Sequence, residues 1–258
     1  MNYIVGDIGN TSTRICLLNQ KFSIVKSVVF ETKKIFKKRY FKNILKKFLK
    51  KNLNSKFLFS GVVPSGLKEI KKNLKSSKYK VVEIKSLDIK KIIKINVKKI
   101  NQLGSDRIVN AIGGRKYKNC LILDFGTATT FDIIKNGIYQ GGVIAPGVKL
   151  SMMNLSNSTA LLPMFSLKNS QKNYGKNTKD ALNAGFIWGY EGLINNIINK
   201  IIIKSKSSYK ITLTGGYARI LKKLIKKKTN IDKDITIKGI AKVYKELIWA
   251  RNSYFFVH

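Results

Sequence analysis

Histidine is nearly missing from this sequence, because the final position, His258, holds the single copy. Catalysis by an imidazole base and zinc binding by histidine are therefore almost excluded. Cysteine is almost as scarce, since Cys16 and Cys120 are the two copies, and each lies in an apolar run typical of a buried strand. We expect both thiols to be small core side chains rather than parts of a disulfide or a metal site.

Long apolar segments are missing too. No apolar run reaches the roughly 18–20 residues that a membrane-spanning helix needs. The sequence opens with the strand-like run Tyr3–Val5 instead of a basic region followed by an apolar segment, so we expect no signal peptide. With 258 residues, 44% of them hydrophobic, the chain can form one large domain or two modest ones with a real core. We expect a cytoplasmic protein that has no membrane partner.

Acidic residues are also few, since 13 aspartates and glutamates stand against 51 lysines and arginines, for a net charge of +38. Such a charge normally points to nucleic acid or an anionic membrane. Here the basic residues are mostly lysines spread over almost every predicted surface segment, and arginine, the usual reader of bases, is rare. The abundance of Ile, Asn and Lys fits a strongly A+T-biased coding sequence. We therefore favour a solvated surface without a specific nucleic-acid partner over a functional polyanion site.

The most informative stretch that is present is a strand–turn–strand motif near the N-terminus, Asp7-Ile8-Gly9-Asn10-Thr11-Ser12-Thr13-Arg14. Apolar runs on both sides predict two buried strands joined by a tight turn. The turn offers N–H groups and hydroxyls to a phosphate chain, and glycine allows close approach. A carboxylate at Asp7 beside phosphates needs a cation, which suggests Mg²⁺. The ordinary alternative is a hairpin whose Asp accepts hydrogen bonds from the turn.

The same order of residue types recurs in the middle of the chain. An apolar strand leads to Asp124, one apolar residue, Gly126 and a hydroxyl-rich turn that contains Thr127 and Thr129. Two such hairpins suggest an internal duplication of a βαβ-containing unit. A later strand is followed by the pair Gly215-Gly216, which would let a flat ligand lie against the backbone. Alone, this pair is a weak signal.

Two phosphate hairpins and a late Gly-Gly turn resemble the superfamily of acetate and sugar kinases and actin-like ATPases. Three further motifs, in this order and spacing, make the chain similar to type III pantothenate kinases from the first strand to the last helix. They are Leu103-Gly104-Ser105-Asp106-Arg107, Gly141-Gly142-Val143-Ile144-Ala145-Pro146-Gly147 and Asn177-Thr178-Lys179-Asp180-Ala181. The resemblance implies an α/β fold of duplicated ribonuclease-H-like domains, with mixed central sheets flanked by helices. We place these domains at 1–117 and 118–258, with the ATP cleft between them.

Apolar spacing predicts the elements of both halves. In the first half we expect a third strand at 22–30, a helix at 37–51, a strand at 56–59, a helix at 67–74, a strand at 80–84, an irregular link at 85–101 and a helix at 105–117. In the second half we expect strands at 120–124, 130–134 and 138–141, a helix from 148, a helix at 179–204 capped by Thr178, a strand at 209–213, a helix to about 228, a strand at 235–237, a closing helix at 239–251 and an apolar tail at 254–257 docked on the body.

Three glycines lie inside the long predicted helix, at Gly185, Gly189 and Gly192. Each costs roughly 0.5–1 kcal/mol relative to alanine in a helix. Their near-helical spacing suggests close packing of another helix or of a neighbouring subunit. Simple tolerance of the glycines is the alternative.

The resemblance implies ATP-dependent phosphorylation of pantothenate to 4′-phosphopantothenate, the first step of coenzyme A biosynthesis. It implies that Asp106 accepts the proton, that Asp124 binds K⁺ or NH₄⁺, and that Thr127 contacts ATP. It also implies a pantothenate site of Gly104, Ser105, Asp106 and Arg107, with Thr178 contributing across a homodimer interface. We assign ATP binding to the first hairpin together with Thr127, and Mg²⁺ to Asp7 through water. The first-hairpin residues are Asp7, Ile8, Gly9, Asn10, Thr11, Ser12, Thr13 and Arg14.

The residues around Asp106 support part of this assignment on their own. Asp106 stands in a Gly-Ser-Asp-Arg turn, and Arg107 can pair with a carboxylate, which pantothenate carries. The ordinary alternative is an acid favoured by the helix dipole in a first turn, next to a surface arginine. The sequence departs from the family at Val97 and Ile100, where the usual residues are Tyr and Pro, so the pantothenate pocket is expected to be remodelled.

Two other functions stay open at the level of sequence. One is a sugar or other small-alcohol kinase of the same superfamily. The other is a catalytically weak regulator or nucleic-acid-binding relative, for which the high positive charge is the support. The presence of Asp7, Asp106 and Asp124 argues against the second alternative. A kinase assay against pantothenate and sugars would separate the three.

Overall fold

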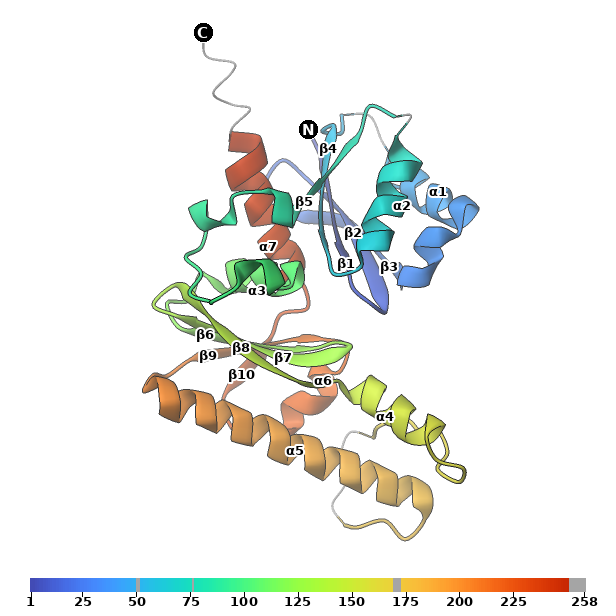
Figure 1. Ribbon diagram of the computed structural model, residues 1–258, viewed down its shortest axis with the longest axis vertical. Coiled ribbons are helices and arrows are strands. Elements are labelled where there is room, and N and C mark those ends of the chain that lie inside the picture. The colour runs from blue at the N-terminus through green and yellow to red at the C-terminus, as the bar shows by residue number, and fades with distance from the viewer. Residues whose placement is uncertain (50–51, 76, 169–172, 251–258) are drawn as a thin grey trace. The chain divides into compact units, whose positions relative to one another are not determined.

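The computed structural model of the chain describes residues 1–49, 52–75, 77–168 and 173–250. It divides into two compact units (Figure 1). Unit 1 comprises Met1–Lys116 together with the C-terminal segment from Asp234, and unit 2 comprises Tyr117–Lys233. The first boundary falls beside the predicted one, whereas the last segment belongs to unit 1 and not to the second domain as predicted. The predicted apolar tail at 254–257 lies outside the described residues.

Unit 1 is built on a five-stranded sheet of order β3-β2-β1-β4-β5. The strands β1 (Tyr3–Ile8), β2 (Ser12–Leu18) and β3 (Ile24–Glu31) form an antiparallel meander. The strands β4 (Lys56–Gly61) and β5 (Lys80–Glu83) extend the sheet in parallel with β1. The carboxyl ends of β1 and β4 therefore meet at one edge, where the Asp7 hairpin and the Ser60–Gly61 strand end lie side by side.

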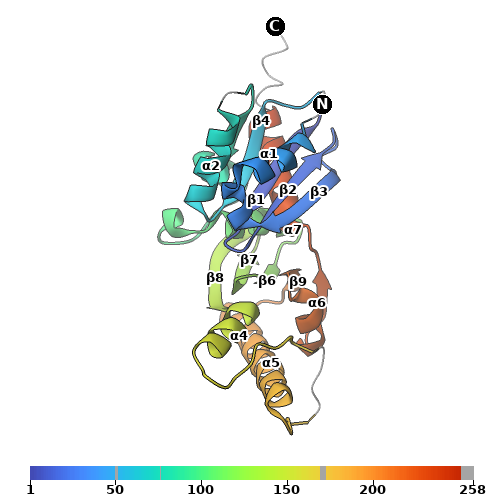
Figure 2. The ribbon, with the colours of Figure 1, turned by 90° about the vertical axis from the view of Figure 1, so that its right-hand side faces the viewer.

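Helices cover both faces of this sheet, because successive side chains of a strand point to opposite sides. Ile4 and Ile8 pack in one core with α1 (Lys38–Lys46) and α2 (Pro64–Leu74). Figure 2 shows α1 and α7 (Ile235–Val243) on opposite sides of the sheet. On the α7 side the Tyr3 ring lies 5.0 Å from the ring of Tyr244, whose hydroxyl donates to the carbonyl of Lys56 at 2.6 Å.

The prediction of a strand at 235–237 is wrong, because these residues begin α7. The β-branched run Ile235-Thr236-Ile237 favours a strand locally. Ile237 and Ile240 recur at helical spacing and are buried, and α7 packs against α3 (Ser105–Gly114), so tertiary packing overrides local preference. The approach is close, since a Cβ on Gly239 would lie 1.8 Å from the carbonyl oxygen of Val109.

Unit 2 repeats the sheet of unit 1, with the order β10-β9-β6-β7-β8. An antiparallel meander is again followed by parallel strands beside its first strand, which confirms the predicted duplication and the α/β fold class. The strands are β6 (Cys120–Phe125), β7 (Ala128–Lys135), β8 (Ile138–Pro146), β9 (Lys210–Gly215) and β10 (Thr229–Ile231).

The helices of unit 2 are α4 (Val148–Asn157), the long α5 (Thr178–Ser205) and the short α6 (Ala218–Leu221). Ile194, Ile198 and Ile201 of α5 share a core with the sheet. The cap of α5 differs from the prediction, since Asn177 precedes the helix and its Oδ1 accepts the N–H of Asp180 at 3.0 Å. Thr178 is the first helical residue.

Smaller differences concern element ends. The link at 85–101 contains 3₁₀ turns at Ile84–Ser86, Ile89–Lys91 and Ile100–Gln102, and the helix predicted to reach 228 ends at Leu221 before a 3₁₀ turn. A 3₁₀ turn at Thr32–Phe36 was not predicted, and π-helical residues Tyr244–Trp249 continue α7.

Both cysteines are fully buried free thiols, as predicted. Burial raises the pKa of the Cys16 thiol, so it stays protonated in the core. Within the described parts of the chain, the helices are too short or too polar to span a bilayer.

Candidate active-site elements in the two units

The first hairpin has the geometry that its sequence predicts. Asp7 pairs with Arg14 and Ile8 with Thr13 across the antiparallel strands, and the N–H of Gly9 donates to the carbonyl of Ser12 at 3.0 Å. The side chains of Asn10, Thr11 and Ser12 are exposed at the tip, where a phosphate chain could reach them. Asp7 is half-buried at the carboxyl end of β1.

Thr13 differs from the other hydroxyl residues of the predicted phosphate cradle, because its side chain is fully buried. Its Oγ1 lies 3.0 Å from Oγ1 of Thr32. Thr32 uses its single hydroxyl proton on the carbonyl of Gly9, at 2.6 Å, so Thr13 is the donor to Thr32. The Thr13 hydroxyl is therefore committed to the protein, and phosphate contact is left to the exposed tip.

Arg14 is held by an ion pair that the sequence did not indicate. Its Nη2 lies 2.6 Å from Oδ1 of Asp234, and its Nε donates to the Ser27 hydroxyl at 2.9 Å. Asp234 directly precedes α7 and is 220 positions away in the sequence, so no local pattern could have revealed it. The predicted ATP contact of Arg14 must share the guanidinium with this partner.

The start of α3 is fixed to the end of β4 by a buried hydroxyl. Oγ of Ser105 donates to the carbonyl of Gly61 and accepts its N–H, both at 2.9 Å, and lies 3.1 Å from Oγ of Ser60. Ser60 is the neighbour of Asp7 in the parallel β1–β4 register. This places Asp106, the next residue of α3, at the same edge of the sheet as Asp7.

The Ser105 hydroxyl is saturated by these three partners, because a hydroxyl has one proton and two lone pairs. Its predicted contact with substrate would therefore have to come from the backbone. Asp106 turns its carboxylate back over the helix start, where Oδ1 accepts the N–H of Arg107 at 2.8 Å. Gly104 makes this possible, since a Cβ there would lie 2.4 Å from Oδ1 of Asp106.

In unit 2 the second hairpin places Asp124 next to Thr130 of β7 and Thr214 of β9. Gly215 lies against it with a φ of +87°, and a Cβ on Gly215 would come within 2.6 Å of both Oδ1 of Asp124 and the backbone N of Phe125. A side chain is excluded there on two grounds, the positive φ and the close approach. Gly215 thus allows β9 to pack closely against the end of β6. A Cβ on Gly216, in contrast, would meet no atom within 4 Å among the described residues.

The turn of the second hairpin is packed from behind by Gly147, which precedes α4. A Cβ on Gly147 would lie 1.9 Å from the carbonyl oxygen of Thr127, so this position excludes a side chain unless the turn moves. Thr127 is half-buried, whereas Thr129 is fully buried, and among the described residues its Oγ1 has no hydrogen-bond partner. Of the two predicted phosphate-binding threonines, Thr127 is the accessible one.

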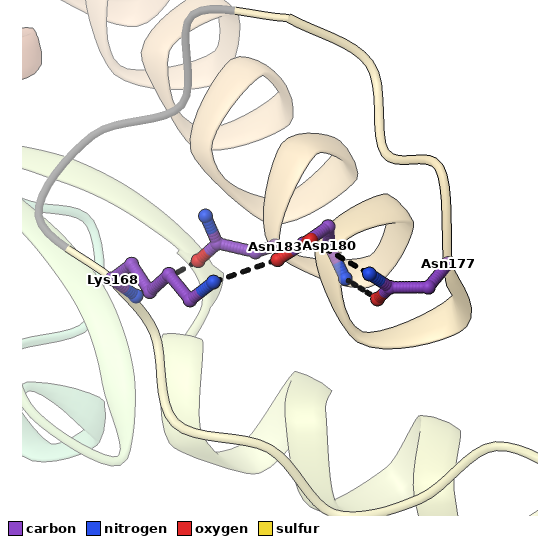
Figure 3. A network of polar contacts seen from close by, with 4 residues as sticks. All are labelled: Lys168, Asn177, Asp180 and Asn183. Carbon is purple, nitrogen blue, oxygen red and sulfur yellow. Dashed lines mark hydrogen bonds and ion pairs between the residues drawn. The ribbon is translucent and has the colours of Figure 1, made fainter.

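Thr178 lies in unit 2, in the first turn of α5, beside a polar network shown in Figure 3. Nζ of Lys168 lies 2.6 Å from Oδ1 of Asp180, and Nδ2 of Asn177 donates to Oδ2 of Asp180 at 2.8 Å. The backbone N–H of Lys168 donates to the buried Asn183 at 2.8 Å. The network ties the 165–168 segment to the start of α5.

This network predicts a pH-dependent contribution to stability. The Lys168 hydrogen bond, and after it that of Asn177, lowers the pKa of Asp180 below its ordinary value of 3.8. A lowered folded-state pKa stabilises the fold above the unfolded value, and the contribution is lost as the pH falls through the folded value. We expect Lys168→Met to lower the urea midpoint at pH 7, and the difference from the wild type to shrink as the pH falls below 3.8. A matched Lys176→Met variant, in the same loop, should show no such convergence.

The donor chemistry fits the two predicted cations. Mg²⁺ usually keeps several waters and binds proteins through one or two carboxylates plus substrate phosphates. Asp7 meets this requirement, and within the described residues no group of three or more His, Cys, Asp or Glu side chains forms a dedicated metal cage. At Asp124 the carboxylate is the predicted oxygen donor, and the backbone of Gly215 packs closely against its Oδ1.

A pocket of about 760 Å³ lies elsewhere in unit 2, between the β7–β8 turn and the C-terminal half of α5. Ile133, Ile138, Ile197 and Ile201 are among its lining residues. The strand β7 begins beside the Thr127 turn and ends at this pocket, so the two lie at opposite ends of the strand. The predicted site residues do not line it, and we assign the chemistry to the hairpins.

Solved structures share this fold. The activator of the 2-hydroxyisocaproyl-CoA dehydratase from Clostridium difficile, with bound ADPNP, aligns with a TM-score of 0.58 at 13% identity, covering 100% of this chain and 98% of that one. The (R)-2-hydroxyglutaryl-CoA dehydratase component A from Acidaminococcus fermentans aligns with a TM-score of 0.54 at 12% identity, covering 93% and 95%. With the duplicated sheets and the two hairpins, this likeness places the protein in the fold class of actin-like ATPases and sugar kinases.

Sequence comparison narrows the class to one family. The model of the type III pantothenate kinase family matches residues 3–200. The type III pantothenate kinase of Pelagibacter ubique is 48% identical over 239 residues, covering 92% of this chain and 96% of that protein. That of Sulfurihydrogenibium sp. is 32% identical over 248 residues, covering 91% and 96%. The chain belongs to the type III pantothenate kinase family.

Proposed function

We propose that this enzyme transfers the γ-phosphoryl group of ATP to the primary hydroxyl of pantothenate, giving 4′-phosphopantothenate and ADP. Membership of the family carries this assignment. The geometry of unit 1 supports it, because the β1–β4 register and the Ser105 hydroxyl bring Asp7 and Asp106 to the same sheet edge. Phosphoryl transfer needs the phosphates and the acceptor hydroxyl to be positioned together.

The residues of unit 1 have separate roles in binding ATP, binding pantothenate and accepting the proton. The exposed tip Asn10–Ser12 binds the phosphate chain. Asp7 would hold Mg²⁺ through water, and the ion would neutralise charge on the phosphates. Arg107 pairs with the pantothenate carboxylate. As the hydroxyl oxygen of pantothenate bonds to the γ-phosphorus, the bond to the β–γ bridging oxygen breaks and ADP leaves. The hydroxyl proton passes to the Asp106 carboxylate.

Unit 2 contributes the second phosphate hairpin. Thr127 is the hydroxyl of that turn that ATP can reach. Asp124 holds K⁺ or NH₄⁺, which offsets the repulsion between its carboxylate and phosphate. The open side of Gly216 leaves room for a flat group such as the adenine ring.

The assay that tests this function uses the purified full chain with ATP, Mg²⁺ and K⁺. Pantothenate and a panel of sugars are offered separately, and ADP release is followed together with the phosphorylated product. The proposal requires pantothenate-dependent turnover. Turnover with a sugar but not with pantothenate would contradict pantothenate as the acceptor and would leave the fold class unchanged.

We also propose that the enzyme is a homodimer. Gly185, Gly189 and Gly192 lie on one exposed face of α5 with Trp188, which is 44% exposed. Among the described residues, a Cβ on any of these glycines would meet no atom within 4 Å, so another helix of the same chain does not fill this face. Close contact with a second copy would account for this stripe, and simple tolerance of the glycines is the alternative that substitution tests.

Substitution of Gly189 tests the dimer. Leucine raises helix propensity relative to glycine, so Gly189→Leu should leave α5 intact while its side chain prevents close approach of a partner. We expect light scattering to give twice the chain mass for the wild type and a weakened or lost dimer for the variant. Lys42→Leu, on the exposed face of α1, is the control and should stay dimeric. An active wild-type monomer would contradict the proposal.

A further inference from the structure

Thr32 contacts the first hairpin at three alternate positions. Its Oγ1 donates to the carbonyl of Gly9 at 2.6 Å, its N–H donates to the carbonyl of Thr11 at 3.0 Å, and its Oγ1 lies 3.0 Å from that of Thr13. The side chain of Thr32 is 3% exposed, and that of Thr13 is completely buried. Thr32 therefore contacts the buried side of the turn at Gly9, Thr11 and Thr13.

The direction of these bonds determines what the turn offers to a ligand. In a trans peptide the C=O of one residue and the N–H of the next point in opposite directions. Because the carbonyls of Gly9 and Thr11 point to Thr32, the N–H groups of Asn10 and Ser12 point away from it. Neighbouring N–H groups directed to one side form an anion-binding concavity, and the two carbonyl dipoles are kept away from the anion.

We propose that Thr32 is a positioning residue for the phosphate chain of ATP, which it serves without touching it. The proposal rests on the proposed function, since it takes the first hairpin as part of the ATP site. It also explains the burial of Thr13, whose hydroxyl completes the chain Thr13–Thr32–Gly9. Without the Thr32 hydroxyl, the Gly9 carbonyl loses its buried partner. The peptide group between Gly9 and Asn10 is then free to rotate, which turns the carbonyl oxygen toward the anion and the Asn10 N–H away from it.

The test uses the full-length enzyme with Thr32→Val, which keeps the shape of threonine and removes the hydroxyl. We expect the dissociation constant for ATP, measured by calorimetry, to rise about 10-fold, because losing a hydrogen bond to a part-buried carbonyl typically has an effect of this order. The KM for ATP should rise in parallel, and the KM for pantothenate should stay within about twofold. Thr32→Ser, which keeps the hydroxyl, should restore ATP binding.

A matched variant separates positioning from general destabilisation. Thr236→Val removes another threonine hydrogen bond of unit 1, in which Oγ1 donates to Asn110 at 2.7 Å, remote in sequence from the hairpin. Both valine variants should lose some thermal stability, but Thr236→Val should keep the wild-type affinity for ATP.

Unchanged ATP affinity in Thr32→Val would overturn the inference, as would equal losses in Thr32→Val and Thr236→Val or no recovery in Thr32→Ser. The calorimetric readout does not depend on which acceptor the enzyme phosphorylates. Failure of pantothenate as acceptor in the wild type would therefore be recognised separately, as failure of the proposed function.

Discussion

Replacing Asp106 with asparagine should reduce kcat by about 10²–10⁴-fold, the usual range for loss of a general base. Asparagine keeps the shape of the side chain, and its oxygen can still accept the Arg107 N–H that now holds Oδ1 of Asp106. What it cannot do is take the proton of the acceptor hydroxyl. The measurement is steady-state turnover with pantothenate, together with calorimetric ATP binding, which should be nearly unchanged.

The control for this variant is Asp88→Asn, which neutralises an exposed carboxylate of the same unit and should keep the wild-type kcat. Wild-type turnover in Asp106→Asn would reject the assignment of the base. A loss of ATP binding with little change in kcat would instead move Asp106 to the nucleotide site. A carboxylate is expected to be the base because other candidate bases are scarce: the one histidine is His258, and both cysteines are buried.

Replacing Asp124 with alanine should abolish the response to K⁺ and lower kcat/KM for ATP by at least about 10-fold, as loss of a group that organises a cation site typically does. The physical reason is local, because the carboxylate lies near the end of β6 beside the predicted phosphate path, with the Gly215 backbone packed closely against its Oδ1. Wild-type activity should rise as K⁺ or NH₄⁺ replaces choline at constant ionic strength. The variant should give a flat titration.

Glu191→Ala is the control for Asp124→Ala, because it removes a carboxylate from α5 of the same unit. It should keep the K⁺ response of the wild type. Full activity of the wild type in choline-only buffer would reject the cation, and a normal K⁺ response in Asp124→Ala would place the cation elsewhere.

The predictions for Asp106 and Asp124 depend on different tertiary contacts. Asp106 is useful only if the start of α3 is fixed relative to β1, and the Ser105–Gly61 pair provides that connection inside unit 1. Asp124 depends on the approach of Gly215 from a parallel strand 91 positions later in the chain. In both cases contacts with a backbone segment remote in the sequence help to place the carboxylate.

The sequence by itself determined the features that depend on neighbouring residues. An apolar strand, an aspartate, a glycine and a hydroxyl-rich turn specify a hairpin locally, and both hairpins formed where this pattern stands. The recurrence of the pattern predicted two equivalent sheets, which the matching strand orders confirm. Burial of Cys16 and Cys120 followed from the same apolar runs.

Tertiary structure decided the features that depend on remote partners. The Ile235–Ile237 run became a helix because α3 offers a close-packing surface, which outweighs the strand preference of β-branched residues. Thr13 turned inward because Thr32, 19 positions away, accepts its hydroxyl, and Arg14 turned to Asp234. Strand register and the approach of distant backbones determine such pairings, and the local spacing of residue types carries no information about either.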